Sequence, residues 1–138
     1  MALLTMARLI LALSALGLLA FGVWMLIAPQ AILAAIGITL QSEAALTEIR
    51  AFYGGLEIGL GLALLFCLLS PGWLRPGLAL SALCYGCVAL CRVGGMLVDG
   101  SGGGFLLGAL AFEAFLCVAC VWALRAERGK ALQAPTGA

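Results

Sequence analysis

Four long runs of apolar residues constrain the fold of this 138-residue chain more than any other feature. A helix rises about 1.5 Å per residue, so about 20 residues cross the roughly 30 Å hydrocarbon core of a bilayer. Inside that core the backbone finds no water to bond, and a run of this length must therefore be helical. The sequence predicts spans at residues 6–27, 47–69, 76–97 and 105–124.

The composition agrees with this interpretation. Hydrophobic residues make up 65% of the chain and charged residues 9%, whereas soluble domains carry about 25% charged residues. The first run exceeds the roughly 7 to 15 apolar residues of a secretion signal, so we expect it to be retained. We predict an all-α integral membrane protein, a four-helix antiparallel bundle over residues 1–124 with a polar tail at 125–138.

Three connections join the predicted spans. Pro29 ends the first span, because the residue before a proline is disfavoured in the helical region. Residues 30–37 are apolar but too short to cross, and we predict a short interfacial or re-entrant helix closed by Gly37, with a loop at 38–45. A Pro-Gly turn at 70–76 and a glycine-rich loop at 99–104 make the later spans antiparallel neighbours.

Basic residues near the span ends predict the orientation. One surface would carry Arg8, Arg75, Arg125, Arg128 and Lys130. Short cytoplasmic loops carry an excess of Lys and Arg, so we expect both termini and the polar tail in the cytoplasm.

The second predicted span contains charged residues at membrane depth. Its stretch EIRAFYGGLEIGLG holds Arg50 and Glu57 two helical turns apart, which predicts one shared face with Tyr53, Gly54 and Gly61. Ionisable side chains in a span usually face the bundle interior and find a partner there.

The other spans place more charges at a similar depth. At about 1.5 Å per residue, Arg92 and Glu113 fall in the same outer half as Arg50 and Glu57. We predict that Arg92 bridges Glu57 and Glu113, and that Arg50 pairs with Asp99, Glu48 or an acid of the network. The network has two interpretations: it sets the register of four helices, or it offers a charge to a ligand.

Small residues on the second span permit close approach. Gly55 and Gly59 form GxxxG, and Gly54 and Gly61 lie beside the Glu57 face. Such positions admit another helix backbone or a flat ligand. Packing within the chain is the simplest interpretation.

Catalytic and metal chemistry finds little support in the sequence. Histidine is absent and the formal charge is +1, which argues against hydrolase or zinc chemistry and against nucleic-acid binding. All six cysteines lie in apolar runs, where free cysteine behaves as a small hydrophobe: Cys67, Cys84, Cys87, Cys91, Cys117 and Cys120. Cys117 and Cys120 share the Glu113 face, and a redox dithiol or soft-metal site there is the weaker alternative.

The motifs of the second span, with RVGGMLVDG at 92–100 and Glu113, resemble a family of small bacterial four-helix membrane proteins catalogued as domain of unknown function 4345. The similarity covers roughly residues 11–124 and includes Pro29 and Gly37. The resemblance implies a four-span bundle and residence in the bacterial inner membrane, and it implies no activity.

Three functional hypotheses follow. The first is a non-enzymatic accessory subunit, or a bundle that associates with copies of itself or with a larger membrane complex. The second is a binder or carrier of a small lipophilic or anionic molecule, such as a lipid, quinone or fatty acid, with Arg50, Tyr53 and Arg92 as donors. The third and weakest is a quinone-linked thiol oxidoreductase. No catalytic residue, metal ligand or obligatory cofactor is predicted; membrane lipids are expected partners.

Overall fold

The computed structural model describes residues 2–133 of the chain, and side chains within 4–126. Its helices are α1 (Ala2–Ile27), α2 (Pro29–Ala35), α3 (Glu43–Ile49), the π-helical turn η1 (Arg50–Gly55), α4 (Leu56–Leu69), α5 (Leu74–Asp99) and α6 (Gly104–Gln133). Because α3, η1 and α4 form one continuous rod, four helices are long and apolar enough to cross a membrane: Leu4–Ile27, Glu43–Leu69, Leu74–Asp99 and Gly104–Ala126. The predicted all-α, four-span fold with a short helix after the first span is confirmed.

The short helix begins where the sequence predicts. Pro29 stands at the first helical position of α2, which buries Pro29, Ile32 and Leu33. Gly37 follows with a φ of 75°, a left-handed conformation that favours glycine.

The second and fourth helices are longer than predicted. The second starts at Glu43 rather than at residue 47, because the Ser42 hydroxyl caps it by accepting a hydrogen bond from the Ala45 amide at 3.1 Å. At the other end of the chain, α6 runs past the predicted end at residue 124 to Gln133. The remainder of the predicted polar tail, residues 134–138, lies outside the described residues.

The π-helical turn η1 changes the register of the second span. A π turn holds one more residue than an α turn. The α-helical period therefore no longer applies between Arg50 and Glu57, and the predicted shared face loses its geometric basis. Arg50 belongs to η1, whereas Glu57 lies in the first turn of α4.

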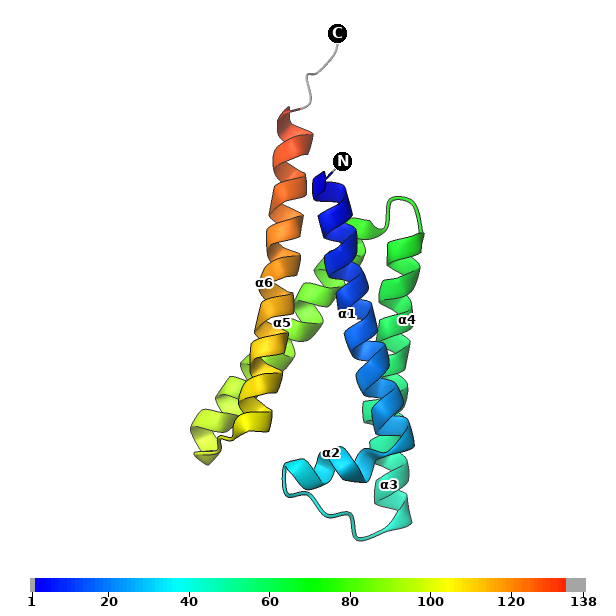
Figure 1. The fold of residues 1–138 in the computed structure, drawn as a ribbon, viewed down its shortest axis with the longest axis vertical. Helices are drawn as coiled ribbons and strands as arrows, with labels where there is room; N and C mark the ends of the chain where they lie inside the picture. The colour runs from blue at the N-terminus through cyan, green and yellow to red at the C-terminus, as the bar shows by residue number, and fades with distance from the viewer. Residues whose placement is uncertain (1, 134–138) are drawn as a thin grey trace.

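The bundle consists of two antiparallel pairs, α1 with α4 and α5 with α6. Figure 1 shows that the pairs approach one another at the end where both termini lie and diverge toward the opposite end. We call these the closed end and the open end. The open end carries α2, α3 and the tip where α5 turns into α6.

Close contact between α1 and the second span depends on glycines, which have no side chain. A Cβ added at Gly22 of α1 would lie 2.9 Å from the Gly54 carbonyl oxygen and from the Ile58 backbone nitrogen. A Cβ at Gly54 would in turn lie 3.2 Å from the Leu26 backbone nitrogen. Helix backbones in membranes meet this closely where small residues stand at the interface.

The hydrophobic core lies toward the closed end and draws on all four spans. Its buried members are Ala7, Leu11, Ala15, Leu18, Leu64, Cys67, Leu78, Tyr85, Leu116, Cys120 and Ala123. Such packing supplies the van der Waals contacts that hold helices together within lipid.

A buried polar cluster ties three helices together inside this core. The Tyr85 hydroxyl donates to the Ser14 carbonyl at 2.9 Å, and the Ser14 hydroxyl donates to the Ile10 carbonyl at 3.0 Å. The Cys120 thiol donates to the Ser81 hydroxyl at 3.2 Å. Among the described residues, no buried side-chain oxygen or nitrogen lacks a hydrogen-bond partner, so this end carries no polar penalty.

Candidate functional site

One ion pair joins α5 to α6 in the half of the bundle toward the open end. The Arg92 guanidinium donates two hydrogen bonds to Glu113, from Nε to Oε2 at 2.9 Å and from Nη2 to Oε1 at 2.5 Å. Side-chain exposure is 24% for Arg92 and 10% for Glu113. Parallel hydrogen bonds between guanidinium and carboxylate are the strongest form of such a pair, and they satisfy both carboxylate oxygens.

Glu57 faces this pair from the other half of the bundle. It is half-buried on α4, within electrostatic range of Glu113 on α6 and of Cys84 and Tyr85 on α5. Within the described part of the chain, no hydrogen bond or ion pair reaches its carboxyl group.

The predicted bridge from Arg92 to both acids is therefore only half present. Arg92 turns to Glu113 on the adjacent helix of its own pair, and Glu57 stands on the pair that diverges from it. The sequence does not reveal the divergence that keeps Glu57 away from this pair.

Arg50 has a different role from the predicted one. Its Nε donates to the Leu26 carbonyl at 3.1 Å, within the last turn of α1, and not to Asp99, Glu48 or the network. A cation is favourable at a helix C-terminus, where carbonyl groups lack partners and the helix dipole is negative. Arg50 thus fastens the start of the second span to the end of the first.

Tyr53 and Asp99 also lie outside the network. Tyr53 is 50% exposed, and Asp99 is exposed at the last position of α5, on the tip of the other helix pair. The two side chains stand on opposite sides of the diverging bundle and do not converge on a common group.

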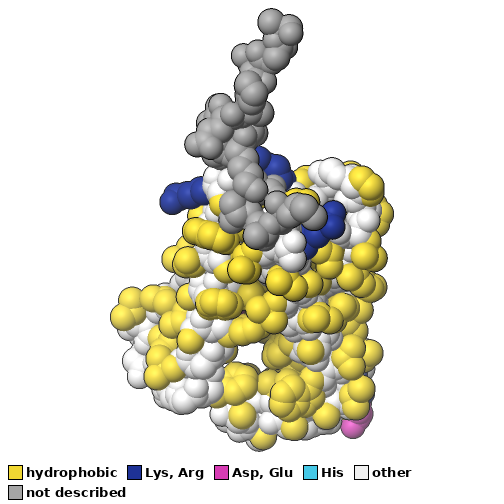
Figure 2. Space-filling view, turned by 45° about the horizontal axis from the view of Figure 1, so that its top comes forward, with side chains coloured by type: hydrophobic (Ala, Val, Ile, Leu, Met, Phe, Trp, Pro, Cys, Tyr) yellow, Lys and Arg dark blue, Asp and Glu magenta, His cyan; other side chains and the backbone are white. Residues whose placement is uncertain are grey.

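The space between the diverging pairs is not filled by side chains. Figure 2 shows an opening through the molecule between the α5–α6 tip and the part that carries α1 and α2. The two helix pairs carry different charged groups. Glu57 belongs to the α1–α4 pair, and the Arg92–Glu113 ion pair belongs to the α5–α6 pair.

Tyr85 is a core residue that lies near these charges. Its hydroxyl bonds to α1 in the core, its ring meets the edge of Phe112 with centroids 6.1 Å apart, and it lies within electrostatic range of Glu57. The sequence pattern does not predict a role for Tyr85, for its partner Ser14 or for Ser81, which bonds to Cys120. Isolated serines inside apolar runs were the available signal, because a hydroxyl in lipid needs a bonding partner.

The four predicted packing glycines divide into two classes. Gly54 and Gly61 pack within the chain, where a Cβ at Gly61 would lie 2.7 Å from Leu19 Cγ. Gly55 and Gly59, the GxxxG pair, have nothing within 4 Å of an added Cβ. The GxxxG motif therefore faces outward.

The cysteines are dispersed. Cys67 and Cys120 are buried in the core, whereas Cys87 and Cys91 are exposed on α5, and none of the six forms a disulfide. In the part of the chain that the structure describes, no three His, Cys, Asp or Glu side chains gather as metal ligands. Of the six cysteines, Cys84 is the one that lies within electrostatic range of Glu57.

Comparison with known proteins identifies a family and no activity. A family model described as "Domain of unknown function (DUF4345)" matches residues 6–124. No curated protein and no solved structure matches the chain. Any specific role must therefore be argued from the geometry.

Proposed function

The chain belongs to the DUF4345 family, a family of unknown function, and from its geometry we propose that this four-span membrane protein binds a small amphiphilic molecule between its two helix pairs. The observation that carries the proposal is the half-buried Glu57 carboxyl, which no described residue bonds. An unpaired acid in a span costs a few kcal/mol on insertion scales. A ligand group that bonds it would remove this cost.

The existing hydrogen bonds indicate which kind of ligand could bind. Arg92 already donates to Glu113, and Arg50 already donates to the Leu26 carbonyl, so the donors that an anionic ligand would need are occupied. The free group is an acid, and a carboxylate accepts hydrogen bonds. We therefore propose a ligand with an amine or hydroxyl at its polar end and an apolar chain, in preference to a fatty acid.

Three probes of equal chain length test this choice: a long-chain amine, a long-chain alcohol and a long-chain carboxylic acid. Retention of each by the purified protein would be measured by native mass spectrometry in a nonionic detergent. We expect the amine and the alcohol to be retained about tenfold better than the acid, since hydrogen bonds to a charged group contribute about 1.5 to 3 kcal/mol. Glu57→Gln should remove this preference.

Glu48→Gln is the matched control, because Glu48 is an exposed acid on the same rod. It should leave the preference intact. The proposal fails if the carboxylic acid is retained best, or if Glu57→Gln and Glu48→Gln behave alike. Preferential retention of a quinone, whose carbonyl groups only accept hydrogen bonds, would require a protonated Glu57 and would also overturn the donor assignment.

A second candidate, an accessory role through self-association, rests on the outward face of the second span. Gly55, Gly59, Leu62 and Phe66 follow one another at helical spacing and are all exposed. The two glycines leave a shallow groove between bulky neighbours, which suits a helix of a second copy. We propose this face as the contact between copies.

Gly55→Leu with Gly59→Leu would fill that groove and should reduce the dimer fraction measured by energy transfer between labelled copies in vesicles. Gly108→Leu is the control, because Gly108 also has open space around it but lies on α6. A monomeric wild-type protein, or equal losses in both variants, would refute self-association by this face.

We also propose residence in the bacterial cytoplasmic membrane with both termini in the cytoplasm. Arg8, Arg75 and Arg125 all lie at the closed end, where the termini are. Lys and Arg near span ends favour the cytoplasmic side. Labelling of single cysteines at either end in intact cells would test the orientation.

A further inference from the structure

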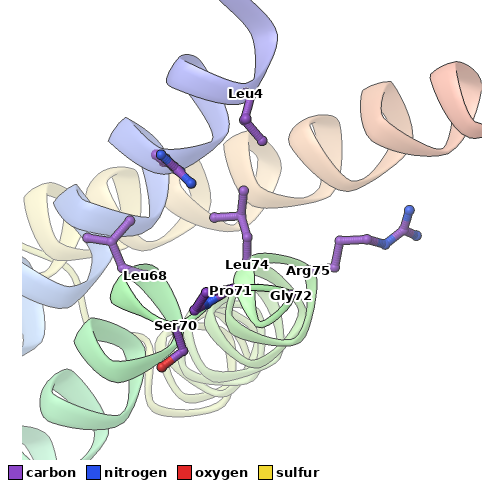
Figure 3. A pocket seen from close by; sticks show the side chains of 8 residues that line it. Leu4, Leu68, Ser70, Pro71, Gly72, Leu74 and Arg75 are labelled. Carbon is purple, nitrogen blue, oxygen red and sulfur yellow. The ribbon is translucent and has the colours of Figure 1, made fainter. Parts of the chain in front are cut away.

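A second hollow lies at the closed end, opposite the Glu57 region. It has a volume of about 250 Å³ and lies between the turn that joins α4 to α5 and the start of α1. Figure 3 shows its lining residues: Leu4, Arg8, Leu68, Ser70, Pro71, Gly72, Leu74 and Arg75.

Two arginines line the hollow, and its described lining holds no acid. Neither Arg8 nor Arg75 has a hydrogen bond or ion pair with any described residue. The long helix α5 starts at the same place with Trp73 as its N-cap and no side-chain cap. Its first backbone amides therefore add donors and the positive end of the helix dipole.

Part of the apolar lining is separate from the Arg75 charge. Figure 3 shows the Leu4 and Leu74 side chains pointing toward each other, while the Arg75 side chain extends away from them. Long arginine stems commonly run along apolar surface and keep the charge at the polar boundary. The hollow thus presents a leucine wall beside a basic rim, which matches a molecule with both a chain and an anionic head.

We infer that this hollow binds the phosphate headgroup of an anionic phospholipid, with part of an acyl chain along the leucines. Both the place and the chemistry support a lipid over a free phosphate ion: the hollow lies at the ends of spans, at headgroup level, and three leucines line it. Basic pockets between spans are suited to anionic headgroups. The site is separate from the Glu57 region and does not depend on the function proposed there.

The test compares two lipids with identical chains, phosphatidylglycerol and phosphatidylcholine, by native mass spectrometry of the full chain in nonionic detergent. Wild-type protein should retain phosphatidylglycerol in preference. The double variant Arg8→Gln, Arg75→Gln should lower that retention about 25-fold, and each single variant about fivefold, following the contribution of about 1 kcal/mol per basic residue near a lipid surface.

Arg125→Gln is the matched control, since Arg125 is an exposed arginine at the same end and does not line the hollow. It should leave retention unchanged, and all variants should keep the wild-type melting temperature. Equal retention of the two lipids, or equal losses in the control and in the double variant, would overturn the assignment. Displacement of phosphatidylglycerol by excess inorganic phosphate would show a free-anion site and would also overturn it.

Discussion

Both ends of the bundle contain polar groups within lipid, but these groups bond between different helices at the two ends. At the closed end, Ser14, Ser81, Tyr85 and Cys120 bond across α1, α5 and α6 and are buried in a shared core. At the open end, the Arg92–Glu113 pair joins only α5 to α6, and Glu57 on α4 has no partner among the residues that the structure describes.

The difference shows which interactions hold the four helices together. Helices in lipid gain little from hydrophobic association, so close packing and polar bonds must supply the specificity. At the closed end both act between the helix pairs. At the open end they act within each pair, so the ion pair stabilises half of the bundle and leaves the space between the halves open.

The largest effect should come from breaking the ion pair. Glu113→Ala leaves the Arg92 guanidinium unpaired among apolar neighbours and should lower the free energy of unfolding by about 3 kcal/mol. The double variant Arg92→Leu, Glu113→Leu should recover most of that loss, because it removes both charges together. Unfolding in mixed micelles with increasing dodecyl sulfate would measure both; equal losses in the single and double variants would contradict the prediction.

A smaller effect should come from separating the first pair. Gly22→Ala puts a Cβ 2.9 Å from backbone atoms of Gly54 and Ile58, which cannot move aside as a side chain can. We expect a loss of about 2 kcal/mol, within the usual range for overpacking. Gly108→Ala is a control with open space and should be neutral or slightly stabilising, since alanine is the better helix former.

The smallest loss of stability should follow Glu57→Gln. Because no described residue bonds its carboxyl group, the amide removes no bond and also removes the cost of an unpaired acid in the span, so the free energy of unfolding should not fall. The same micelle titration would measure it beside Glu113→Gln. A loss for Glu57→Gln as large as that for Glu113→Gln would mean that Glu57 belongs to the network after all.

The sequence determines the fold closely because hydropathy and run length are local properties. All four spans were predicted within a few residues, and the errors have local causes, such as the Ser42 cap that starts the second span early. The continuation of α6 beyond residue 124 is not predicted by hydropathy, because the residues that follow are charged and yet remain helical to Gln133.

The site could be predicted only in part, because pairing depends on how helices meet. The depth of Glu57, Arg92 and Glu113 follows from helical rise, and the ion pair between the neighbouring α5 and α6 was expected. The π turn at Arg50–Gly55 and the divergence of the two pairs leave no simple periodic signal. They decide the partners of Arg50 and Glu57, and they turn Gly55 and Gly59 outward.

The bond from Arg50 to the Leu26 carbonyl makes the intervening chain a loop that is closed at its base. Within that loop α2 is anchored by buried residues, but residues 38–42 are almost wholly exposed. Each doubling of the length of a flexible loop costs only about 0.6 kcal/mol in closure entropy. An epitope or reporter inserted there should leave the spans in place, which makes this loop a convenient handle for finding which side of the membrane it faces.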